Sequence, residues 1–378
     1  MAASFFLLGS EKKGVSAWAH ERFQRRETAL AKQIKSRIRK FGPMTFRDFM
    51  ATALYDSCHG FYAKGPGIGC RDGSFNTNAM FPAFAFAMAR AIEQAESTIG
   101  EPLRIVEFGG GTGELSANIL SFLSSPHEYV CIEPSGGLRR LQGTHGLRSV
   151  PFVKDLDAAP TFAFGNEVLD ALPVHRVMGD GTGHILEIYV GLNEKEEFIE
   201  IPDTSSTPSL SDRLKNEKVV LGRGQVGEVC LELEQFLKGP ASMISKGYLV
   251  FIDYGDEAAS LYSYLHRNGT LRSYRAQNRT VDPFDHIGDQ DLTADVDFTA
   301  LQAASKNFGF WLAGFLQQGR WLQNLGIQEY EQQIPRSSGD VPSEVELLTH
   351  PAKLGSSFDV IAFKTSNLPD PPGFSQLS

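Results

Sequence analysis

The sequence predicts an α/β fold with a mostly parallel, Rossmann-like sheet that is covered by helices. Short apolar runs without polar alternation recur between segments of helical periodicity, as expected of parallel strands buried on both faces. The first of these runs, 103–108, leads directly into the glycine-rich turn 109–113, and a helical segment follows the turn. The 378 residues suffice for two domains, or for one large α/β domain with insertions.

Residues 1–100 are expected to form a helical N-terminal cap. Its helices are predicted from three segments with helical patterning, at 16–40, 45–54 and 80–98. In the first segment Leu30, Ile34 and Ile38 recur every four residues and form one apolar stripe. Thr45 supplies the side-chain oxygen that an N-cap requires, so the second helix is predicted to begin there.

Residues 101–378 are expected to form the Rossmann-like domain. Its strands are predicted from six apolar runs, at 103–108, 129–133, 152–153, 161–164, 248–253 and 358–363. Helices are predicted after the first two strands, at 114–123 and from residue 138 onward. The distance between the fourth and fifth strands is too long for a single crossover, so an inserted β meander is predicted at about 174–240. A second insertion, polar and irregular, is predicted at about 256–300.

The charge balance argues against nucleic acid as the partner. Lys and Arg number 36, Asp and Glu number 45, and the net charge is −9, whereas a protein that binds phosphates by ionic contacts usually has a basic surplus. The acidic balance is compatible with a cationic substrate such as a Lys or Arg side chain. The four cysteines form no CxxC pair and the histidines no HxH or HxxxH pair, so neither a disulfide framework nor a metal site is predicted.

The hydropathy pattern predicts no membrane insertion, because no apolar run approaches the roughly 18–20 residues that a bilayer-spanning helix needs. The segment Met1–Ser10 lacks a basic start and a clear cleavage site, which argues against a signal peptide. The first positive charges arrive late, beside Glu11, which also disfavours a mitochondrial presequence. The expected location is therefore the bacterial cytoplasm, with the mitochondrial matrix as the alternative.

The turn after the first strand has the features of a ligand-binding loop. It reads Glu-Phe-Gly-Gly-Gly-Thr-Gly over 107–113, and glycines let the backbone approach a ligand at the carboxyl edge of the sheet. A dinucleotide fingerprint needs its third glycine at position 114, where Glu114 stands, so a nicotinamide oxidoreductase is a weaker alternative. The remaining alternative is a tight turn with solvated acids.

A second acidic residue supports a nucleoside-containing cofactor. Glu133 ends the second predicted strand, where a carboxylate can accept hydrogen bonds from both hydroxyls of a ribose. S-adenosylmethionine has a ribose and no pyrophosphate, which suits this spacing. The residues predicted to bind it are Glu107, Gly109, Gly111, Gly113 and Glu133.

The fourth predicted strand ends in a second group of polar residues, Asn166, Glu167 and Asp170. A helical turn would place Glu167 and Asp170 on one face, where two carboxylates can hold a guanidinium in a fork. Methyl transfer to nitrogen depends mainly on positioning and electrostatics, so these three are the predicted catalytic residues. The alternative is that Asn166 or Asp170 only caps a helix.

Several motifs, in order along the chain, resemble those of the MidA-type methyltransferase family, which includes the mitochondrial complex I arginine methyltransferase. The glycine turn and the Asn166 segment carry the most specific part of the resemblance. The similar segments are 42–45, 59–62, 106–115, 132–135, 166–174, 253–255, 269–272 and 291–298.

The resemblance implies a class I methyltransferase fold with a helical N-terminal cap, and S-adenosyl-L-methionine as methyl donor. It also implies a protein arginine N-methyltransferase acting on a partner such as a respiratory complex I subunit. One departure favours an alternative: Asn78-Ala79-Met80 replaces a Ser-Pro-Glu found in many relatives, which removes a carboxylate. The alternative is an assembly factor or chaperone that binds the cofactor without transferring methyl groups.

Overall fold

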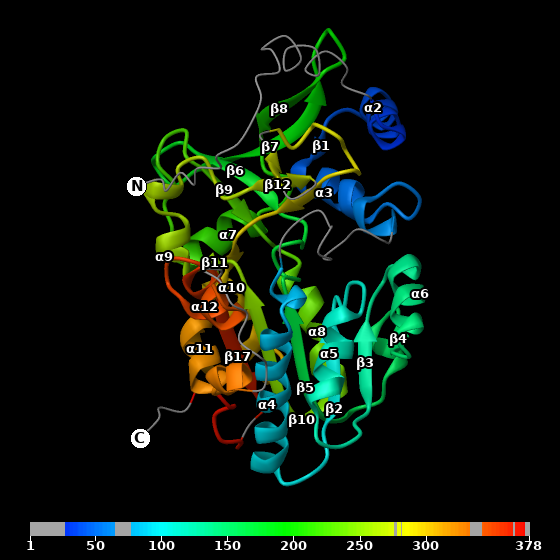
Figure 1. Cartoon of the computed structure of the whole chain (residues 1–378). Coiled ribbons are helices and arrows are strands. Elements are labelled where there is room, and N and C mark those ends of the chain that lie inside the picture. Colours follow the sequence, from blue (N-terminus) through cyan, green and yellow to red (C-terminus); the bar gives the residue numbers. More distant parts are fainter. Residues whose placement is uncertain are drawn as a thin grey trace, which may run out of the picture.

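The computed structural model describes residues 27–64, 77–275, 278–280, 282–332, 342–365 and 367–374. Its central element is a seven-stranded sheet with the order β16-β17-β10-β5-β2-β3-β4 (Figure 1). The strands span Arg104–Phe108 (β2), Tyr129–Ile132 (β3), Arg148–Val150 (β4), Ala159–Asn166 (β5), Ile244–Asp253 (β10), Trp311–Gln317 (β16) and Asp359–Lys364 (β17). Neighbours from β10 to β4 are parallel, and only β17 runs antiparallel to both of its neighbours. The predicted mostly parallel sheet is confirmed.

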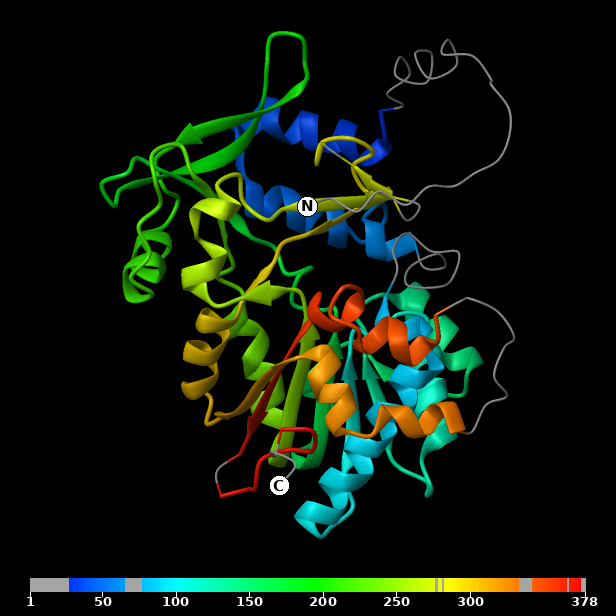
Figure 2. The ribbon, with the colours of Figure 1, turned by 60° about the vertical axis from the view of Figure 1, so that its left-hand side comes forward.

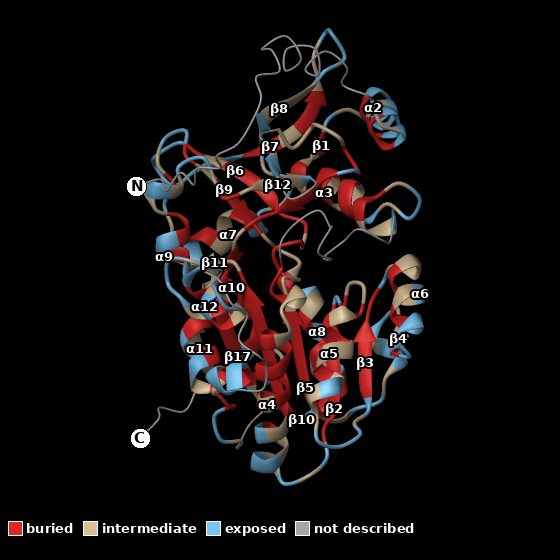
Figure 3. Cartoon of the chain, viewed as in Figure 1, coloured by how far each residue is buried: buried red, intermediate tan, exposed pale blue. Residues whose placement is uncertain are grey.

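Helices cover both faces of this sheet, as Figures 1 and 2 show. They span Pro82–Ile99 (α4), Glu114–Phe122 (α5), Gly136–Thr144 (α6), Leu233–Met243 (α8), Phe298–Lys306 (α10), Gln318–Asn324 (α11) and Glu344–Thr349 (α12). One core cluster includes α4, α5, α11 and α12, and another includes α8 and α10. Successive side chains of a strand point to opposite faces, so Ile105 belongs to the first cluster and Val106 to the second. Figure 3 shows the strands between these layers as buried.

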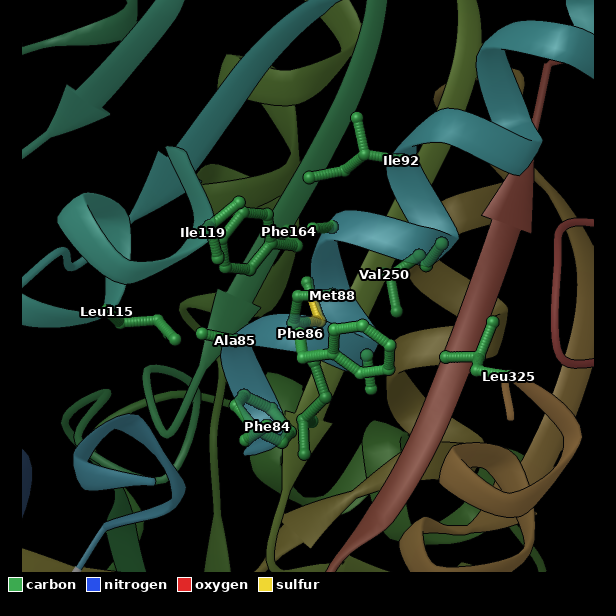
Figure 4. Close-up of a cluster of buried hydrophobic side chains, with 14 of the residues drawn as sticks. Phe84, Ala85, Phe86, Met88, Ile92, Leu115, Ile119, Phe164, Val250 and Leu325 are labelled. Atoms are coloured by element: carbon green, nitrogen blue, oxygen red, sulfur yellow. The ribbon is translucent and has the colours of Figure 1, made fainter. Parts of the chain in front are cut away.

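Helix α4 contributes the centre of the first cluster. Its Phe84, Phe86 and Ile92 lie in one buried group with Ile119 of α5 and Phe164 of β5 (Figure 4). Each of these side chains is at most 7% exposed, so the helix is part of the core that supports the sheet. The predicted boundary at residue 100 would instead place α4 in the helical N-terminal cap. The boundary itself stays a prediction.

The remaining N-terminal helices are α2 (Ala29–Phe41) and α3 (Phe46–Tyr55). Thr45 caps α3 as predicted, because its hydroxyl oxygen accepts a hydrogen bond from the Asp48 amide at 3.1 Å. The predicted stripe of α2 is buried at Leu30, Ile34 and Ile38. The part of the first predicted helix before residue 27 lies outside the described residues.

The first insertion forms the predicted antiparallel meander. Strands β6 (His175–Gly179), β7 (Ile185–Leu192) and β8 (Phe198–Asp203) pair in succession, and β9 (Val226–Val229) adds to β6. The N-terminal β1 (Met44–Thr45) pairs with β7, and a shared core cluster joins α2 and α3 to this sheet. Helices α2 and α3 therefore form one body with the meander, and this body, called the cap below, lies above the carboxyl ends of the central strands in Figure 1.

The second insertion is more regular than predicted. It contains a three-stranded sheet of β12 (Arg272–Arg275), β13 (Asn278–Thr280) and β14 (Asp291–Thr293). The short strands β11 (Gly255–Asp256) and β15 (Val296–Asp297) pair beside it. The other short helices of the described chain are Phe61–Lys64 (η1), Asn78–Met80 (η2), Val153–Asp155 (η3), Ser209–Asn216 (α7), Ala258–Leu261 (α9), Tyr264–His266 (η4), Ile327–Gln332 (η5) and Leu354–Ser356 (η6). Within the described part of the chain, no helix has the length and apolar character to cross a bilayer.

Two strand predictions at the sheet edges were wrong. The third strand is β4, which uses Arg148–Val150 to pair with β3, whereas Phe152 is 54% exposed and Val153 starts a 3₁₀ turn. The other edge strand, β16, was not predicted, because its Trp311 and Leu312 are exposed and follow no simple pattern. Edge strands are buried on fewer sides than central ones, so their sequences carry a weaker apolar signal.

Candidate active site

A cavity of about 310 Å³ opens at the carboxyl ends of β2, β3 and β5, beneath the cap. Its wall includes the glycine turn and the ends of β3 and β5, and the helical elements that contribute to it are α3, η1, η2, α5, α6 and α8. Its lining includes Tyr55, Tyr62, Thr77, Glu107, Gly109, Gly110, Gly111, Glu114, Glu133, Leu138, Asn166, Glu167, Ala171 and Phe236. The tertiary structure thus brings together all but two of the predicted site residues, which are Gly113 and Asp170.

The glycine turn has the backbone geometry that the sequence predicted. Gly109, Gly111 and Gly113 have φ values of 67°, 52° and 88°, which favour glycine. A Cβ atom on Gly109 would lie 2.7 Å from Val168 Cγ2, whereas one on Gly111 would meet no protein atom within 4 Å. Gly111 therefore borders open space in the cavity, where a ligand can approach the backbone.

Gln142 of α6 holds this turn from outside the cavity and was missed in the sequence. Its Nε2 donates to the Gly111 carbonyl at 2.9 Å, and the side chain is fully buried. A glutamine at an internal position of a predicted helix gives no signal of such a contact, because only the fold places α6 beside the turn.

Glu107 occupies a buried position at the end of β2. The Tyr129 hydroxyl donates to its Oε2 at 2.6 Å, and the Ser116 hydroxyl donates to the same oxygen. Burial raises the pKa of Glu107, and the two hydroxyl bonds oppose that shift. The carboxyl thus links β2 to β3 and α5, and its predicted contact with the cofactor stays a prediction.

Glu133 lies where β3 ends, buried and on the cavity wall. Its Oε1 accepts the Ser135 amide at 2.8 Å. Burial raises the pKa of Glu133 to about 7, while the Ser135 amide, the charge of Arg139 and the Gly111 amide act in the opposite direction. A carboxyl in this position can accept hydrogen bonds from the hydroxyls of a bound ribose, and this contact stays a prediction.

The segment after β5 differs from the prediction. Glu167 has a positive φ of 52°, and a turn follows it in place of the expected helix. Asp253 of β10 stabilises this turn, because its Oδ2 accepts the amides of Val168, Leu169 and Asp170 at 3.1, 2.8 and 3.3 Å. The buried Asp253 carboxylate therefore satisfies three successive backbone amides of this turn.

Glu167 and Asp170 consequently do not share a helical face, and this part of the prediction was wrong. Asp170 is buried behind the turn and does not line the cavity. Its pKa is raised well above the usual range, first by burial and then by the charges of Asp253 and Asp291. Asp170 belongs to a buried acidic group rather than to the cavity wall.

The Glu167 carboxyl is half-buried and faces several donors. Its Oε1 accepts the Thr77 hydroxyl at 2.5 Å, the Asn166 amide Nδ2 at 3.0 Å and the Asn78 backbone amide at 3.2 Å. Burial raises the pKa of Glu167 to about 7, although these hydrogen bonds lower it. Two predicted catalytic residues, Asn166 and Glu167, thus lie together on the cavity wall.

Asn78 belongs to the sequence segment that departs from the family pattern, and the structure places it beside the predicted catalytic residues. It is fully buried, and its Nδ2 donates to Gln318 Oε1 at 2.7 Å and to Asn166 Oδ1 at 3.4 Å. The carboxylate of the family's Ser-Pro-Glu corresponds to Met80, whereas Asn78 joins Asn166 and Gln318 in a network of neutral amides. Gln318, 240 residues away in the chain, had no sequence signal.

The cap adds two aromatic side chains to the wall. Tyr55 and Tyr62 stack with ring centroids 5.4 Å apart. Their hydroxyls donate to the Ala171 carbonyl at 2.9 Å and to Asp291 Oδ1 at 3.1 Å, respectively. Tyr62 and Asp291 fall in segments that the resemblance highlighted, whereas Tyr55 closes an ordinary amphipathic helix and could not have been selected.

The region around Glu167 carries a surplus of carboxyl groups. Burial raises the pKa of Asp253 and of Asp291 to about 7. The neighbouring Arg272 forms an ion pair with Asp295. A cationic ligand would be favoured in this half of the cavity, since it would offset the mutual repulsion of the acids. Among the described residues, no group of three or more His, Cys, Asp or Glu side chains could hold a metal ion.

Comparison with known proteins gives consistent matches. A family model described as "Putative S-adenosyl-L-methionine-dependent methyltransferase" matches residues 84–316. A mitochondrial "Protein arginine methyltransferase NDUFAF7 homolog" of Drosophila melanogaster is 24% identical, over 88% of this chain and 84% of its own length. The mitochondrial protein arginine methyltransferase NDUFAF7 of Rattus norvegicus is 23% identical, over 89% of this chain and 84% of its own length.

Two solved structures from Burkholderia thailandensis are similar over almost the whole chain. One, bound to S-adenosyl-homocysteine, has a TM-score of 0.83 and 28% identity, covering 97% of this chain and 98% of its own. The other, a native crystal structure, has a TM-score of 0.81 and 27% identity with the same coverage.

Proposed function

Because the chain belongs to this family of S-adenosyl-L-methionine-dependent methyltransferases, we propose that it methylates an arginine side chain of a partner protein. The position of the Glu167 carboxyl carries this proposal: it lines the same cavity as the glycine turn, and acids surround it. An acidic pocket favours a cationic acceptor, and arginine is the most persistent cation among the side chains.

The cavity fits the family's cofactor. Gly111 leaves open space at the backbone of the turn, and the Glu133 carboxyl can accept ribose hydroxyls. Glu107, Gly109, Gly111, Gly113 and Glu133 are the residues proposed to form this half of the site. S-adenosylmethionine supplies an electrophilic methyl group when it is bound.

Glu167 is proposed to orient the acceptor and to take its proton. All the described donors to this carboxyl bond to Oε1, which leaves Oε2 for the acceptor. The acceptor nitrogen gains the methyl carbon as the sulfur–carbon bond breaks, and it loses one proton, which Glu167 Oε2 accepts. A guanidinium beside the carboxyl lowers the pKa of Glu167, so that the residue is ionised when the acceptor is bound. Asn166 holds the carboxyl through its 3.0 Å hydrogen bond.

The names of the curated relatives support the acceptor class, although their identity is only 24% and 23%. A respiratory complex I subunit as the partner remains a prediction from the resemblance. Those relatives are named as mitochondrial, which supports the mitochondrial matrix as the location, and the bacterial cytoplasm remains the other prediction.

The test has two stages. Calorimetric titration with S-adenosylmethionine and S-adenosylhomocysteine establishes whether both bind the purified protein. The protein is then incubated with methyl-labelled cofactor and an extract of source cells that lack it, and labelled proteins are hydrolysed for amino-acid analysis. Label in methylated arginine is the expected result.

The outcomes separate the candidate functions. Cofactor binding without labelled protein would favour the assembly factor that the neutral Asn78 network suggests. Label in lysine or in another residue would retain the methyltransferase and overturn the arginine acceptor. No binding of either ligand by a folded protein would contradict the whole proposal.

A further inference from the structure

The aromatic wall of the cavity consists of Tyr55, the last residue of α3, and Tyr62 of η1. The two rings are nearly parallel, with an interplanar angle of 22°. Tyr55 is 44% exposed. The buried Phe61 packs edge-on against Tyr62, with the two ring centroids 5.1 Å apart. Both tyrosines line the same cavity as the glycine turn and Glu167.

The hydroxyl groups of this wall are already engaged. Tyr55 donates to the Ala171 carbonyl and Tyr62 to the Asp291 carboxyl, so each hydrogen bond ties the cap to a distant segment. Burial of the phenol groups raises the pKa of both tyrosines, which keeps both hydroxyls protonated. What the pair can offer a ligand is therefore the surface of the rings rather than a free hydroxyl.

The surroundings of the rings are acidic. Tyr62 contacts Asp291, and the charges of Asp170 and Glu133 also act on Tyr55. The face of an aromatic ring carries partial negative charge and attracts organic cations, most strongly where water is excluded. Ring faces next to buried carboxyls favour a cation over a neutral group of the same shape.

We propose that Tyr55 and Tyr62 form a charge-selective wall that recognises an organic cation, a sulfonium or a guanidinium, inside the cavity. The identity of these cations rests on the proposed function, since the methyl donor carries a sulfonium and an arginine acceptor a guanidinium. Either source has the same consequence. In both cases the wall favours the cation over a neutral isostere. For the sulfonium it also favours the methyl donor over its neutral product, which assists exchange after each reaction, whereas a methylated arginine keeps its charge.

The experiment uses variants that separate ring from hydroxyl. Tyr55→Phe and Tyr62→Phe keep the rings, whereas Tyr55→Leu and Tyr62→Leu remove them, and thermal melts confirm that each protein is folded. One arm measures the affinities for S-adenosylmethionine and for the neutral S-adenosylhomocysteine by calorimetry. The other arm compares argininamide with the neutral citrulline amide, with and without S-adenosylhomocysteine.

The expected result is a loss of charge preference in the leucine variants. Their affinity for the cation falls on the order of tenfold relative to the neutral ligand, and the phenylalanine variants stay within about twofold of the wild type. If the leucine variants lose charge preference only between the two S-adenosyl compounds, the wall recognises the sulfonium. If they lose it only between argininamide and citrulline amide, the wall recognises the guanidinium of the acceptor.

Equal weakening of charged and neutral ligands in both arms, or no change in either, would overturn the proposal. The same holds if the phenylalanine variants lose the preference as fully as the leucine variants, because the hydroxyls would then be responsible. A wild-type protein that binds neither S-adenosyl compound contradicts the methyltransferase function instead. The argininamide comparison without cofactor still tests the wall in that case.

Discussion

The two halves of the cavity are built in different ways. The cofactor half comprises Glu107, the turn 109–113 and Glu133, and the donors to its carboxyls, Ser116, Tyr129 and Ser135, lie within 22 residues of them. The acid half has Glu167 on its wall, and the buried Asp170, Asp253 and Asp291 lie near it without lining the cavity. Here the donors to Glu167, apart from its neighbour Asn166, come from a segment 89–90 residues away. The contacts of the first half come from one β-α-β unit and the helix α6 that follows it, whereas the second half needs segments that are distant in the chain.

The halves also differ in electrostatics. In the cofactor half burial raises the pKa of Glu133 and one neighbouring carboxyl, Glu107, adds to the shift, whereas the charge of Arg139 and two backbone amides lower it. In the acid half the neighbouring carboxylates raise one another's pKa, as Asp253 and Asp291 do for Asp170. Such crowding costs stability in the absence of a ligand, and a bound cation or proton relieves it. The comparison suggests that the acid half is organised for its ligand at the expense of the free protein.

Replacing Glu167 should give the largest effect. Glu167→Gln is expected to lower methyl transfer at least about 100-fold, because it removes the proton acceptor, and to leave cofactor affinity within about twofold. Transfer of labelled methyl groups and calorimetry measure the two quantities. Asp170→Asn is the matched control, since this acid belongs to the same group but does not line the cavity. Equal losses in both variants would show that the acids act only as a structural unit.

Glu133 tests the cofactor half. Glu133→Gln should weaken S-adenosylmethionine binding by about 10- to 100-fold, the range for lost hydrogen bonds to a charged group. Its pKa of about 7 means that the ionised fraction rises with pH. Wild-type affinity should therefore increase up to about tenfold between about pH 6 and about pH 8, and the variant should lose this dependence. Glu114→Gln, also on the cavity wall, is the control expected to keep it.

Gly109 lies where the halves meet, because a Cβ there would clash with Val168, next to Glu167. Gly109→Ala should lower the free energy of unfolding by about 1–3 kcal/mol, from its positive φ and this contact. It should also impair both cofactor binding and transfer. Gly143→Ala in α6, where a Cβ meets no atom within 4 Å, should instead stabilise the protein by about 0.5–1 kcal/mol. Urea titration measures the free energy of unfolding of both variants. Equal values for the two would contradict the requirement for glycine at position 109 of the turn.

The buried acids should also make the stability depend gradually on pH. Asp291 and Asp253 have pKa values raised to about 7, against about 4 in an unfolded chain. Between these values the folded protein binds more protons, so the stability that protonation provides is complete below about pH 4 and lost as pH rises through about 7. As the pH rises through this window, each such carboxyl should lower the free energy of unfolding by about 1 kcal/mol for every pH unit. Asp291→Asn should flatten the slope in thermal melts, and an unchanged slope would refute this assignment.

Several features followed from the sequence because they depend on short stretches of chain. The central strands are apolar along their length because both faces are buried, and the glycines of 109–113 mark backbone angles that other residues avoid. Glu133 could be found because the end of a parallel strand fixes where its side chain lies. The Thr45 cap is likewise a contact between residues only three positions apart.

Only the tertiary structure determined how the acid half is assembled around the predicted Asn166 and Glu167. No local pattern shows that Asp253 accepts the amides after Glu167, that Gln318 meets Asn78, or that two cap tyrosines line the cavity. In the structure a turn bonded to Asp253 stands in place of the expected helix, and Asp170 does not line the cavity. These contacts join residues far apart in the chain, and they form because core packing brings their elements together rather than because of any preference of the residues themselves.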